Sequence, residues 1–104
     1  MSKFLPAAIL ACLPLLTLPA QAAGDAAAGA GKAAMCVGCH GVDGNSVVPM
    51  FPKLAGQHAQ YLEVAMKAYR SQDRKGGSAA QMYPMVAALS DQDIADLAAF
   101  FASK

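Results

Sequence analysis

The sequence predicts a small all-α domain with three main helices and two long loops. Apolar residues recur at helical spacing in residues 58–69 and 90–101, and an alanine-rich segment follows a capping residue at position 25. No segment alternates polar and apolar residues in the way that predicts a half-buried strand. The connections between the helical segments contain glycine and proline, which favour loops. We therefore expect helices packed on one another and no sheet.

Residues 1–22 have the features of a cleaved export signal. An apolar run extends from Phe4 to Pro19, and Ala20-Gln21-Ala22 gives the small-x-small pattern that precedes a cleavage site. The run is short and interrupted by prolines, so it does not predict a stable membrane span. Cys12 ends the sequence "ILAC", which resembles a lipoprotein signal, but such a signal would hold only eleven residues before the cysteine.

The expected mature domain, residues 23–104, is small and electrically balanced. Because Lys3 belongs to the leader, seven basic residues face seven acidic ones. This balance predicts no nucleic-acid-binding surface and no membrane-binding surface. A chain of about 80 residues builds only a marginal core by itself. We therefore expect a disulfide, metal or cofactor to complete it.

Each predicted helix has a start signal or an apolar face. The first follows Asp25 as a possible cap and runs through Ala26–Cys36. The second, His58–Tyr69, has apolar residues at i, i+3, i+4 and i+7. The third begins at Ser90, where Asp93 in the third position approximates a capping box. Residues 41–56 and 70–84 are expected to be loops that surround a bound group.

Cys36, Cys39 and His40 form the pattern Cys-x-x-Cys-His at the end of the first predicted helix. This is the pattern by which haem is attached covalently as c-type haem. Two cysteines three positions apart can reach two vinyl groups as thioethers, and the adjacent imidazole then lies below the iron. Attachment and coordination are thus one local event, and the sequence predicts one covalently attached haem c.

Three other uses of these residues are less well supported. A thioredoxin-like redox pair would need a preceding strand in a βαβ unit, which the sequence does not show. A zinc site would need a fourth ligand, for which His58 is the spare histidine. A structural disulfide across three residues would close a small strained loop.

A haem iron bound by His40 has a sixth position, and methionine is a ligand that suits electron transfer. Met82 and Met85 lie far enough along the chain to reach the opposite haem face, and spacing alone does not separate them. The other three mature methionines are interpreted as core residues, namely Met35, Met50 and Met66.

Three stretches resemble the small bacterial class I cytochromes c, especially the units that occur in tandem in diheme cytochrome c-four. They are "AGDAAAGAGKAAMCVGCHGVDGNS", "FPKLAGQHAQYL" and "LSDQDIADLAAFFAS", which together span most of the mature chain. The resemblance implies the class I cytochrome c fold, with three main helices and long loops around one haem. One Cys-x-x-Cys-His implies a single such unit.

The resemblance also implies roles for particular residues. The distal methionine of the family lies eight residues before the serine that opens the last helix, which is Met82, with Met85 the alternative. Pro49 would offer its carbonyl oxygen to the proximal imidazole, and Phe51 would pack on the haem edge. Gly29 and Ala33 would provide a small helix face that the last helix crosses closely.

Several polar residues have two interpretations. His58 is expected to be exposed or to cap a helix, although it could be imagined as an axial ligand. Arg70, Arg74 and Lys75 could steer an acidic redox partner or simply be a solvated helix end. The three tyrosines could bind the haem propionates or only pack: Tyr61, Tyr69 and Tyr83.

These expectations predict a monomeric, periplasmic one-electron carrier and not an enzyme. If His40 and Met82 fill both axial positions, the iron has no open site for a substrate. The carrier would dock transiently with other respiratory redox proteins. Alternative functions are a cytochrome subunit that accepts electrons within a dehydrogenase complex, and a gas-binding or sensor haem protein. Without haem, the chain is expected to be largely unfolded.

Overall fold

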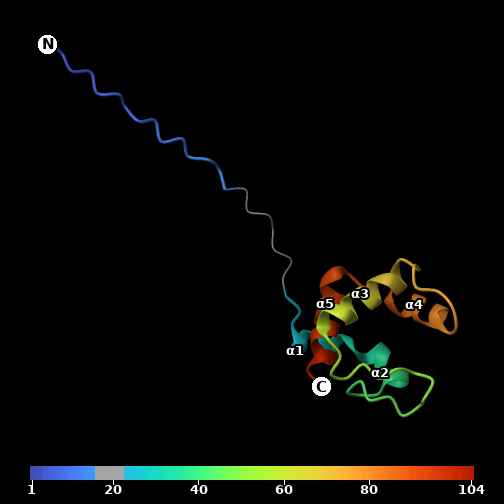
Figure 1. The fold of residues 1–104 in the computed structure, drawn as a ribbon. Helices are drawn as coiled ribbons and strands as arrows, with labels where there is room; N and C mark the ends of the chain where they lie inside the picture. The colour runs from blue at the N-terminus through green and yellow to red at the C-terminus, as the bar shows by residue number, and fades with distance from the viewer. Residues whose placement is uncertain (16–22) are drawn as a thin grey trace.

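The computed structural model describes residues 1–15 and 23–104 of the chain (Figure 1). Its α-helices are α1 (Ala26–Lys32), α2 (Ala34–His40), α3 (Ala59–Arg70), α4 (Tyr83–Val86) and α5 (Asp91–Ala102), and a 3₁₀ turn, η1, spans Ala79–Met82. The described ranges contain no strand. The all-α prediction is therefore confirmed.

The N-terminal residues stand apart from the helical domain. Residues 1–15 form no helix and extend away from it (Figure 1). Within the described parts of the chain, no helix has the length and apolar character needed to cross a bilayer. The expected cleavage pattern Ala20-Gln21-Ala22 lies outside the described residues, so the leader remains a prediction.

Two predicted helix starts are confirmed by their caps. The Asp25 carboxylate accepts hydrogen bonds from the backbone N–H groups of Ala27 and Ala28, at 2.9 and 3.3 Å. Ser90 and Asp93 form a reciprocal capping box, in which each side chain accepts from the other residue's backbone N–H at 3.0 and 2.9 Å. These bonds satisfy donors that a helix end would otherwise leave unpaired.

Two predicted boundaries differ from the structure. The first predicted helix is divided at Ala33 into α1 and α2, and it continues beyond Cys36 to His40. The stretch 70–84, which was predicted as loop, contains η1 and the start of α4. Pro84 does not prevent α4, because it occupies the first turn, where its missing N–H would have no partner within the helix.

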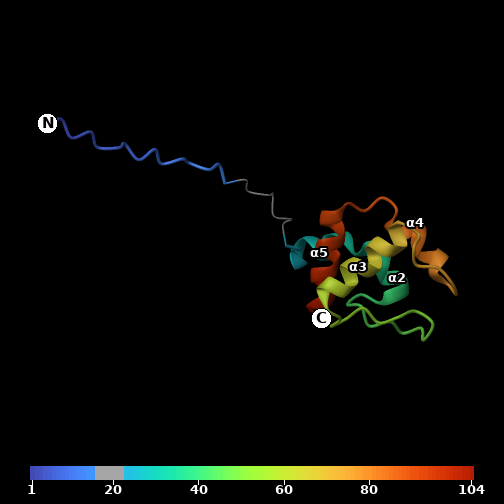
Figure 2. The same cartoon turned by 45° about the horizontal axis from the view of Figure 1, so that its top comes forward.

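Helix α5 packs against both α1 and α3, and this packing forms most of the core (Figures 1 and 2). Ala33, Leu62, Leu97 and Phe101 are buried where these helices meet. A Cβ atom on Gly29 would lie 2.0 Å from the Asp96 carbonyl oxygen, so the crossing of α1 and α5 has no room for a side chain there. The predicted small face of the first helix is confirmed.

A polar network that the sequence analysis did not predict joins the same two helices. Asp96 on α5 is only 3% exposed. Its carboxylate accepts from the Lys32 Nζ at 2.6 Å, from the Asp25 backbone N–H at 2.9 Å and from the Gln92 amide at 2.8 Å. Lys32 also pairs with Asp93 at 2.8 Å. Every one of these donors favours the ionised carboxylate, which explains why a charge is tolerated in the core.

Candidate functional site

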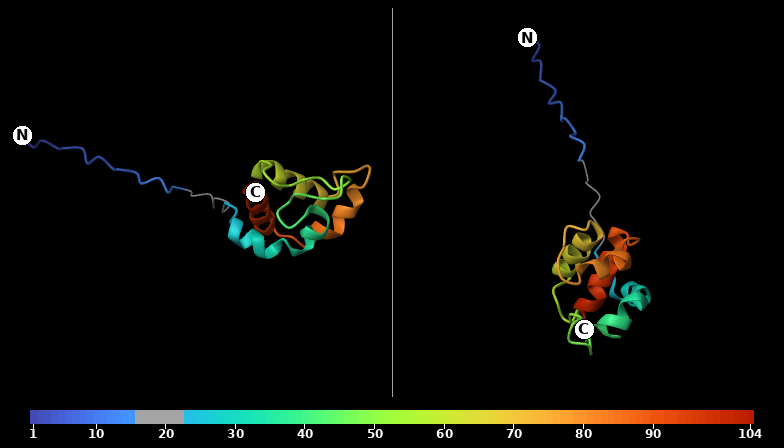
Figure 3. Two further views of the ribbon diagram at one scale, coloured as in Figure 1. Left: turned by 90° about the horizontal axis from the view of Figure 1, so that it is seen from below. Right: turned by 90° about the vertical axis from the view of Figure 1, so that its right-hand side faces the viewer.

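A cavity of about 660 Å³ lies between α2, α3, α4 and the loop that follows α2. Figure 3 shows α2, α4 and this loop gathered at one end of the domain. Leu97 and Phe101 of α5 also contribute to its wall, so the cavity borders the core directly. Its size lies within the range of pockets that hold organic cofactors, roughly 300 to 1,000 Å³.

Helix α2 brings all three motif residues to this cavity: Cys36, Cys39 and His40 all line it. Cys36 is half-buried, Cys39 is exposed, and no disulfide joins them. Burial raises the pKa of the Cys36 thiol above its usual range, and the adjacent Cys39 adds to that rise. A redox-active pair normally contains a thiol of lowered pKa, so the Cys36 environment does not favour that use.

The described residues contain no group of three or more His, Cys, Asp and Glu side chains placed to share one metal ion. The zinc interpretation of the motif needs such a group. It therefore gains no support from the structure. The three side chains instead line a cavity much larger than an ion.

His40 is buried, and its Nδ1 lies 2.8 Å from the carbonyl oxygen of Pro52. Because a carbonyl oxygen can only accept, Nδ1 carries the proton in this bond. Nε2 is then the nitrogen with a free lone pair, which is the form that binds a metal. A bond of this kind also fixes the ring orientation and makes the coordinating nitrogen more basic.

The expectation that Pro49 supplies this carbonyl is wrong, because Pro52 supplies it. The path of the loop gives the reason. Gly41 ends α2 with φ +86°, the Leu54 N–H donates to the Gly44 carbonyl at 2.8 Å, and the Ser46 hydroxyl donates to the Phe51 carbonyl at 2.6 Å. These bonds return the chain to His40 at Pro52, three residues after Pro49.

Phe51 lies beside the imidazole and lines the cavity. Its ring centroid is 6.5 Å from that of His40, in an edge-to-face arrangement. A planar group bound to His40 would therefore lie against Phe51. The packing of Phe51 on the haem edge stays a prediction.

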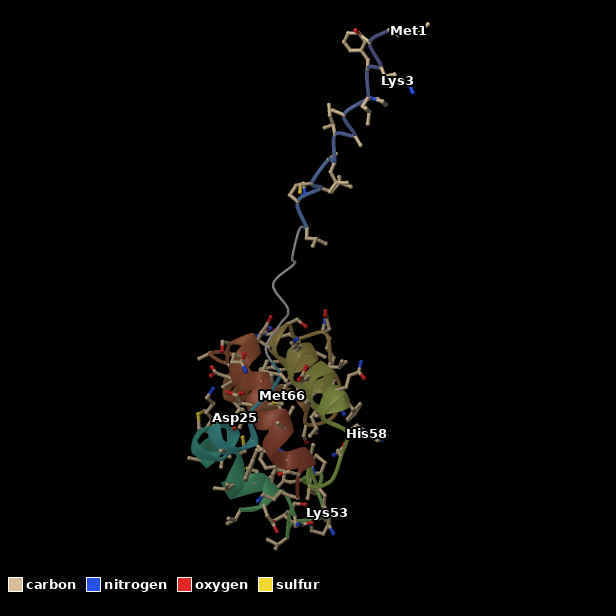
Figure 4. All side chains as sticks on the ribbon, turned by 90° about the vertical axis from the view of Figure 1, so that its left-hand side faces the viewer. Met1, Lys3, Asp25, Lys53, His58 and Met66 are labelled. Carbon is tan, nitrogen blue, oxygen red and sulfur yellow. The ribbon has the colours of Figure 1, made fainter. Side chains whose placement is uncertain are left out.

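Both candidate distal methionines reach the cavity from η1 and α4. Met82 is half-buried, and Met85 is 40% exposed. Met66 packs against the core, as predicted, and Figure 4 shows it within the helical domain. The same prediction is wrong for Met35 and Met50, which are 59% and 79% exposed and lie at the cavity. An exposed methionine at a cavity edge has no local sequence signal that separates it from a buried one.

His58 is not among the cavity residues. It precedes α3 as an exposed residue at the edge of the domain (Figure 4), and its side chain makes no capping hydrogen bond. The prediction of an exposed side chain is confirmed, and the capping alternative is wrong. An axial role for His58 has no support in this geometry.

The basic cluster divides into residues with different surroundings. Arg70 donates to the Leu89 carbonyl at 2.9 Å and pairs with Asp91 at 2.5 Å, so it ties α3 to the start of α5. Arg74 and Lys75 instead line the cavity. Of the tyrosines, Tyr61 and Tyr69 line the cavity, whereas the Tyr83 hydroxyl donates to the Arg74 carbonyl at 2.6 Å.

These residues fit a covalently held haem. Two thiols on one helical turn, an imidazole with a free Nε2 and two methionine sulfurs all reach one cavity, whose wall is mostly apolar. A soft sulfur ligand opposite an imidazole is a recognised haem environment.

A sequence model described as "Cytochrome c" matches residues 26–104. The chain belongs to the cytochrome c family. Its cofactor is accordingly haem c, covalently attached, and its family consists of electron carriers. The prediction of haem c from the Cys-x-x-Cys-His pattern and the predicted family resemblance are both confirmed.

Relatives of this cytochrome c differ in length. Cytochrome c-554(548) from Halomonas halodenitrificans is 57% identical over 82 residues, which is 79% of this chain and 99% of the relative. Cytochrome c4 from Azotobacter vinelandii is 53% identical over 91 residues, which is 82% of this chain but 43% of the relative. The chain therefore spans less than half of that longer protein.

A solved structure supports the fold. The reduced recombinant cytochrome c4 from Pseudomonas stutzeri superposes with a TM-score of 0.70 at 46% sequence identity, covering 79% of this chain and 46% of that one. The present cytochrome thus has the fold of one unit of that protein, and the class I cytochrome c prediction is confirmed.

Proposed function

We propose that this cytochrome is a periplasmic one-electron carrier whose haem is attached through Cys36 and Cys39 and coordinated axially by His40 and Met82. After removal of residues 1–22, residues 23–104 would form the mature monomer. The carrier would exchange electrons with other respiratory redox proteins in short-lived encounters. Such complexes usually have small interfaces.

The observation that carries this proposal is that the motif residues and Met82 line one cavity while His40 Nδ1 is already bound to the Pro52 carbonyl. This bond orients the imidazole, with Nε2 as its coordinating atom. Met82 is more buried than Met85, which favours it as the sulfur that a desolvated iron would meet.

The haem supplies an iron that changes between ferric and ferrous states by one electron. The polypeptide would hold this iron through His40 and Met82, exclude water and keep both side chains in place. Leu97 and Phe101 keep the inner wall apolar, and the His40–Pro52 bond limits rotation of the imidazole. With both positions filled, no site is open for a substrate. Electron transfer through the haem edge is what this arrangement can perform.

Spectroscopy of Met82→Ala and Met85→Ala tests the ligand assignment. The ferric wild type should be low-spin, with the far-red charge-transfer band of iron–sulfur coordination. Met82→Ala should lose this band and show a lower reduction potential, because a soft neutral ligand has been removed. Met85→Ala should keep the band. Loss of the band in Met85→Ala alone would overturn the assignment to Met82.

The same holoprotein distinguishes a carrier from the other candidate functions. A high-spin ferric spectrum and ready binding of carbon monoxide would indicate a gas-binding or sensor haem and contradict the proposal. Gel filtration of a native periplasmic extract tests whether the cytochrome is a free monomer or part of a larger complex. A carrier should elute as a small monomer, and elution with a much larger haem-free chain would indicate a subunit of an enzyme complex.

A further inference from the structure

The cavity wall carries an unequal distribution of charge. Arg74 and Lys75, which follow α3, line it, and within the described residues no Asp or Glu does. Across the same described ranges, neither cation forms an ion pair with an acidic side chain. Arg70, only four residues before Arg74, differs because its guanidinium is bound to Asp91 and to the Leu89 carbonyl.

Arg74 is held in position by contacts with two helices. Its guanidinium carbon lies 4.8 Å from the centroid of the Tyr69 ring, which is a cation–π contact with α3. Its backbone N–H donates to the Ala68 carbonyl at 3.2 Å, and its own carbonyl accepts from the Tyr83 hydroxyl of α4 at 2.6 Å. A guanidinium fixed in this way has its donors available to an anion.

The group that enters this cavity is itself anionic at one edge. Haem carries two propionate carboxylates on the side of the ring opposite its vinyl groups. If the vinyl edge is bonded to Cys36 and Cys39 on α2, the carboxylates must lie toward other elements of the wall. Carboxylates placed against a mostly apolar wall need hydrogen-bond donors and positive charge.

We propose that Arg74 and Lys75 form the binding site for the haem propionates. This inference rests on the proposed attachment of haem at α2. Arg74 can bind a carboxylate through two N–H groups, and Lys75 adds a second positive charge at the same edge. Because the Arg74 carbonyl is bound to Tyr83, which follows Met82 directly, the site also connects the propionate edge to the segment that carries the distal ligand.

The reduction potential follows from this arrangement. Anionic propionates stabilise the ferric state, and cations bound to them offset that effect. Replacing either cation with a neutral residue should therefore lower the potential. It should also make the potential depend on pH near neutrality, since a propionate without its partner takes up a proton more readily.

Other titratable groups near this edge do not provide the same charge. The titratable side chains that α2 and α3 contribute to the cavity wall are Cys36, Cys39, His40, Tyr61 and Tyr69. On α4, Tyr83 uses its hydroxyl on the Arg74 carbonyl. Asp73, beside Arg74 in the chain, accepts from the Ser71 hydroxyl at 2.9 Å and is not part of the wall.

The test compares Arg74→Gln, Lys75→Gln and the double variant with Arg70→Gln as the matched control, all as purified holoprotein. Spectroelectrochemical titration from about pH 5 to 8 should give lower potentials for the three cavity variants, lowest for the double variant, and a steeper dependence on pH.

The control variant Arg70→Gln should lose thermal stability, because Arg70 is bound to Leu89 and Asp91, and it should keep the wild-type potential. Lys75→Gln keeps the test usable if Arg74→Gln fails to fold, because Lys75 is exposed and its side chain makes no hydrogen bond in the described structure.

Two results would overturn the inference. One is a double variant that holds haem with an unchanged low-spin spectrum, potential and pH profile. The other is an unchanged potential together with a weaker salt dependence of electron transfer to an acidic redox partner, which would assign both cations to docking. Absence of alkali-stable, protein-bound haem in the wild type would instead contradict the proposed function.

Discussion

Lys32 and Asp96 join the first and last helices through an ion pair with 2.6 Å between Nζ and Oδ2. Asp96 is buried at the crossing of α1 and α5, and the same lysine reaches Asp93 one turn earlier on α5. The Lys32 ammonium is the main cause that lowers the pKa of both carboxyls to about 2. This relationship makes the packing of the two helices depend on charge.

The stability of the domain should therefore fall in acid over a defined range. The pKa of each carboxyl is lower in the folded chain than its usual 3.8, so the stabilisation is complete above about pH 4 and is lost as pH falls toward about 2. Asp96→Asn should lower the melting temperature at pH 7 and make the loss between pH 4 and 2 less steep. Asp73→Asn is the control, since Asp73 lies on the surface and its carboxylate accepts a hydrogen bond from the Ser71 hydroxyl. An Asp96→Asn melting curve that follows pH as the wild type does would contradict this role.

Gly29→Ala should destabilise the holoprotein by about 1 to 3 kcal/mol or more, because the added carbon meets backbone at the α1–α5 crossing. Gly31→Ala is the matched control on the same helix. No atom lies within 4 Å of the Cβ position of Gly31, and alanine favours helix by roughly 0.5 to 1 kcal/mol over glycine. Thermal unfolding followed by circular dichroism should thus move the two variants in opposite directions. Equal melting temperatures would show that the crossing can open without cost.

Gly41→Ala should disturb the loop that brings the Pro52 carbonyl to His40. Its φ is +86°, and a Cβ atom there would lie 2.3 Å from the Asn45 carbonyl oxygen. We expect a loss of about 1 to 3 kcal/mol from the backbone conformation alone, and more from the contact. If the His40–Pro52 bond weakens, the imidazole becomes a poorer donor to iron, and the reduction potential should rise.

Gly77→Ala separates the effect of backbone conformation from the effect of the contact with the Asn45 carbonyl. Gly77 has φ +51°, and no atom lies within 4 Å of its Cβ position. It should show the loss from backbone conformation alone, about 1 to 2 kcal/mol, and no change in potential. If both variants behave alike in calorimetry and in potentiometric titration, the loop contact has no part in holding His40.

The Cys36→Ser, Cys39→Ser double variant should be largely unfolded. Without an attached haem, a cavity of about 660 Å³ borders Leu97 and Phe101, and the core of so small a domain does not offset that loss. Far-ultraviolet circular dichroism should show little of the wild-type helix content. Cys12→Ser is the control, since Cys12 lies outside the domain and should leave the holoprotein unchanged. Native helix content in the double variant would refute the dependence on haem.

Local patterns in the sequence were sufficient for the three main helical segments and for the chemistry of attachment. The Asp25 cap, the Ser90–Asp93 capping box and the helical spacing near Leu62 all depend on residues within one or two turns, and all are confirmed. The Cys-x-x-Cys-His motif is local in the same sense, because its three side chains project from one short helix. The short helix α4 was not predicted. Gly76, Gly77 and Pro84 together indicate a loop, and a proline is compatible with a helix only within its first turn, which is where Pro84 lies.

What the sequence by itself determined is the three main helical segments, the covalent haem motif and the small face of α1. The tertiary structure decided which carbonyl reaches His40, which arginine is bound to α5 and which lines the cavity, and how a buried Asp96 obtains its partners. The physical reason is that helix periods and caps act between near neighbours. The partners of His40, Arg70 and Asp96 depend instead on the paths of loops and on helix crossings, which no local period encodes.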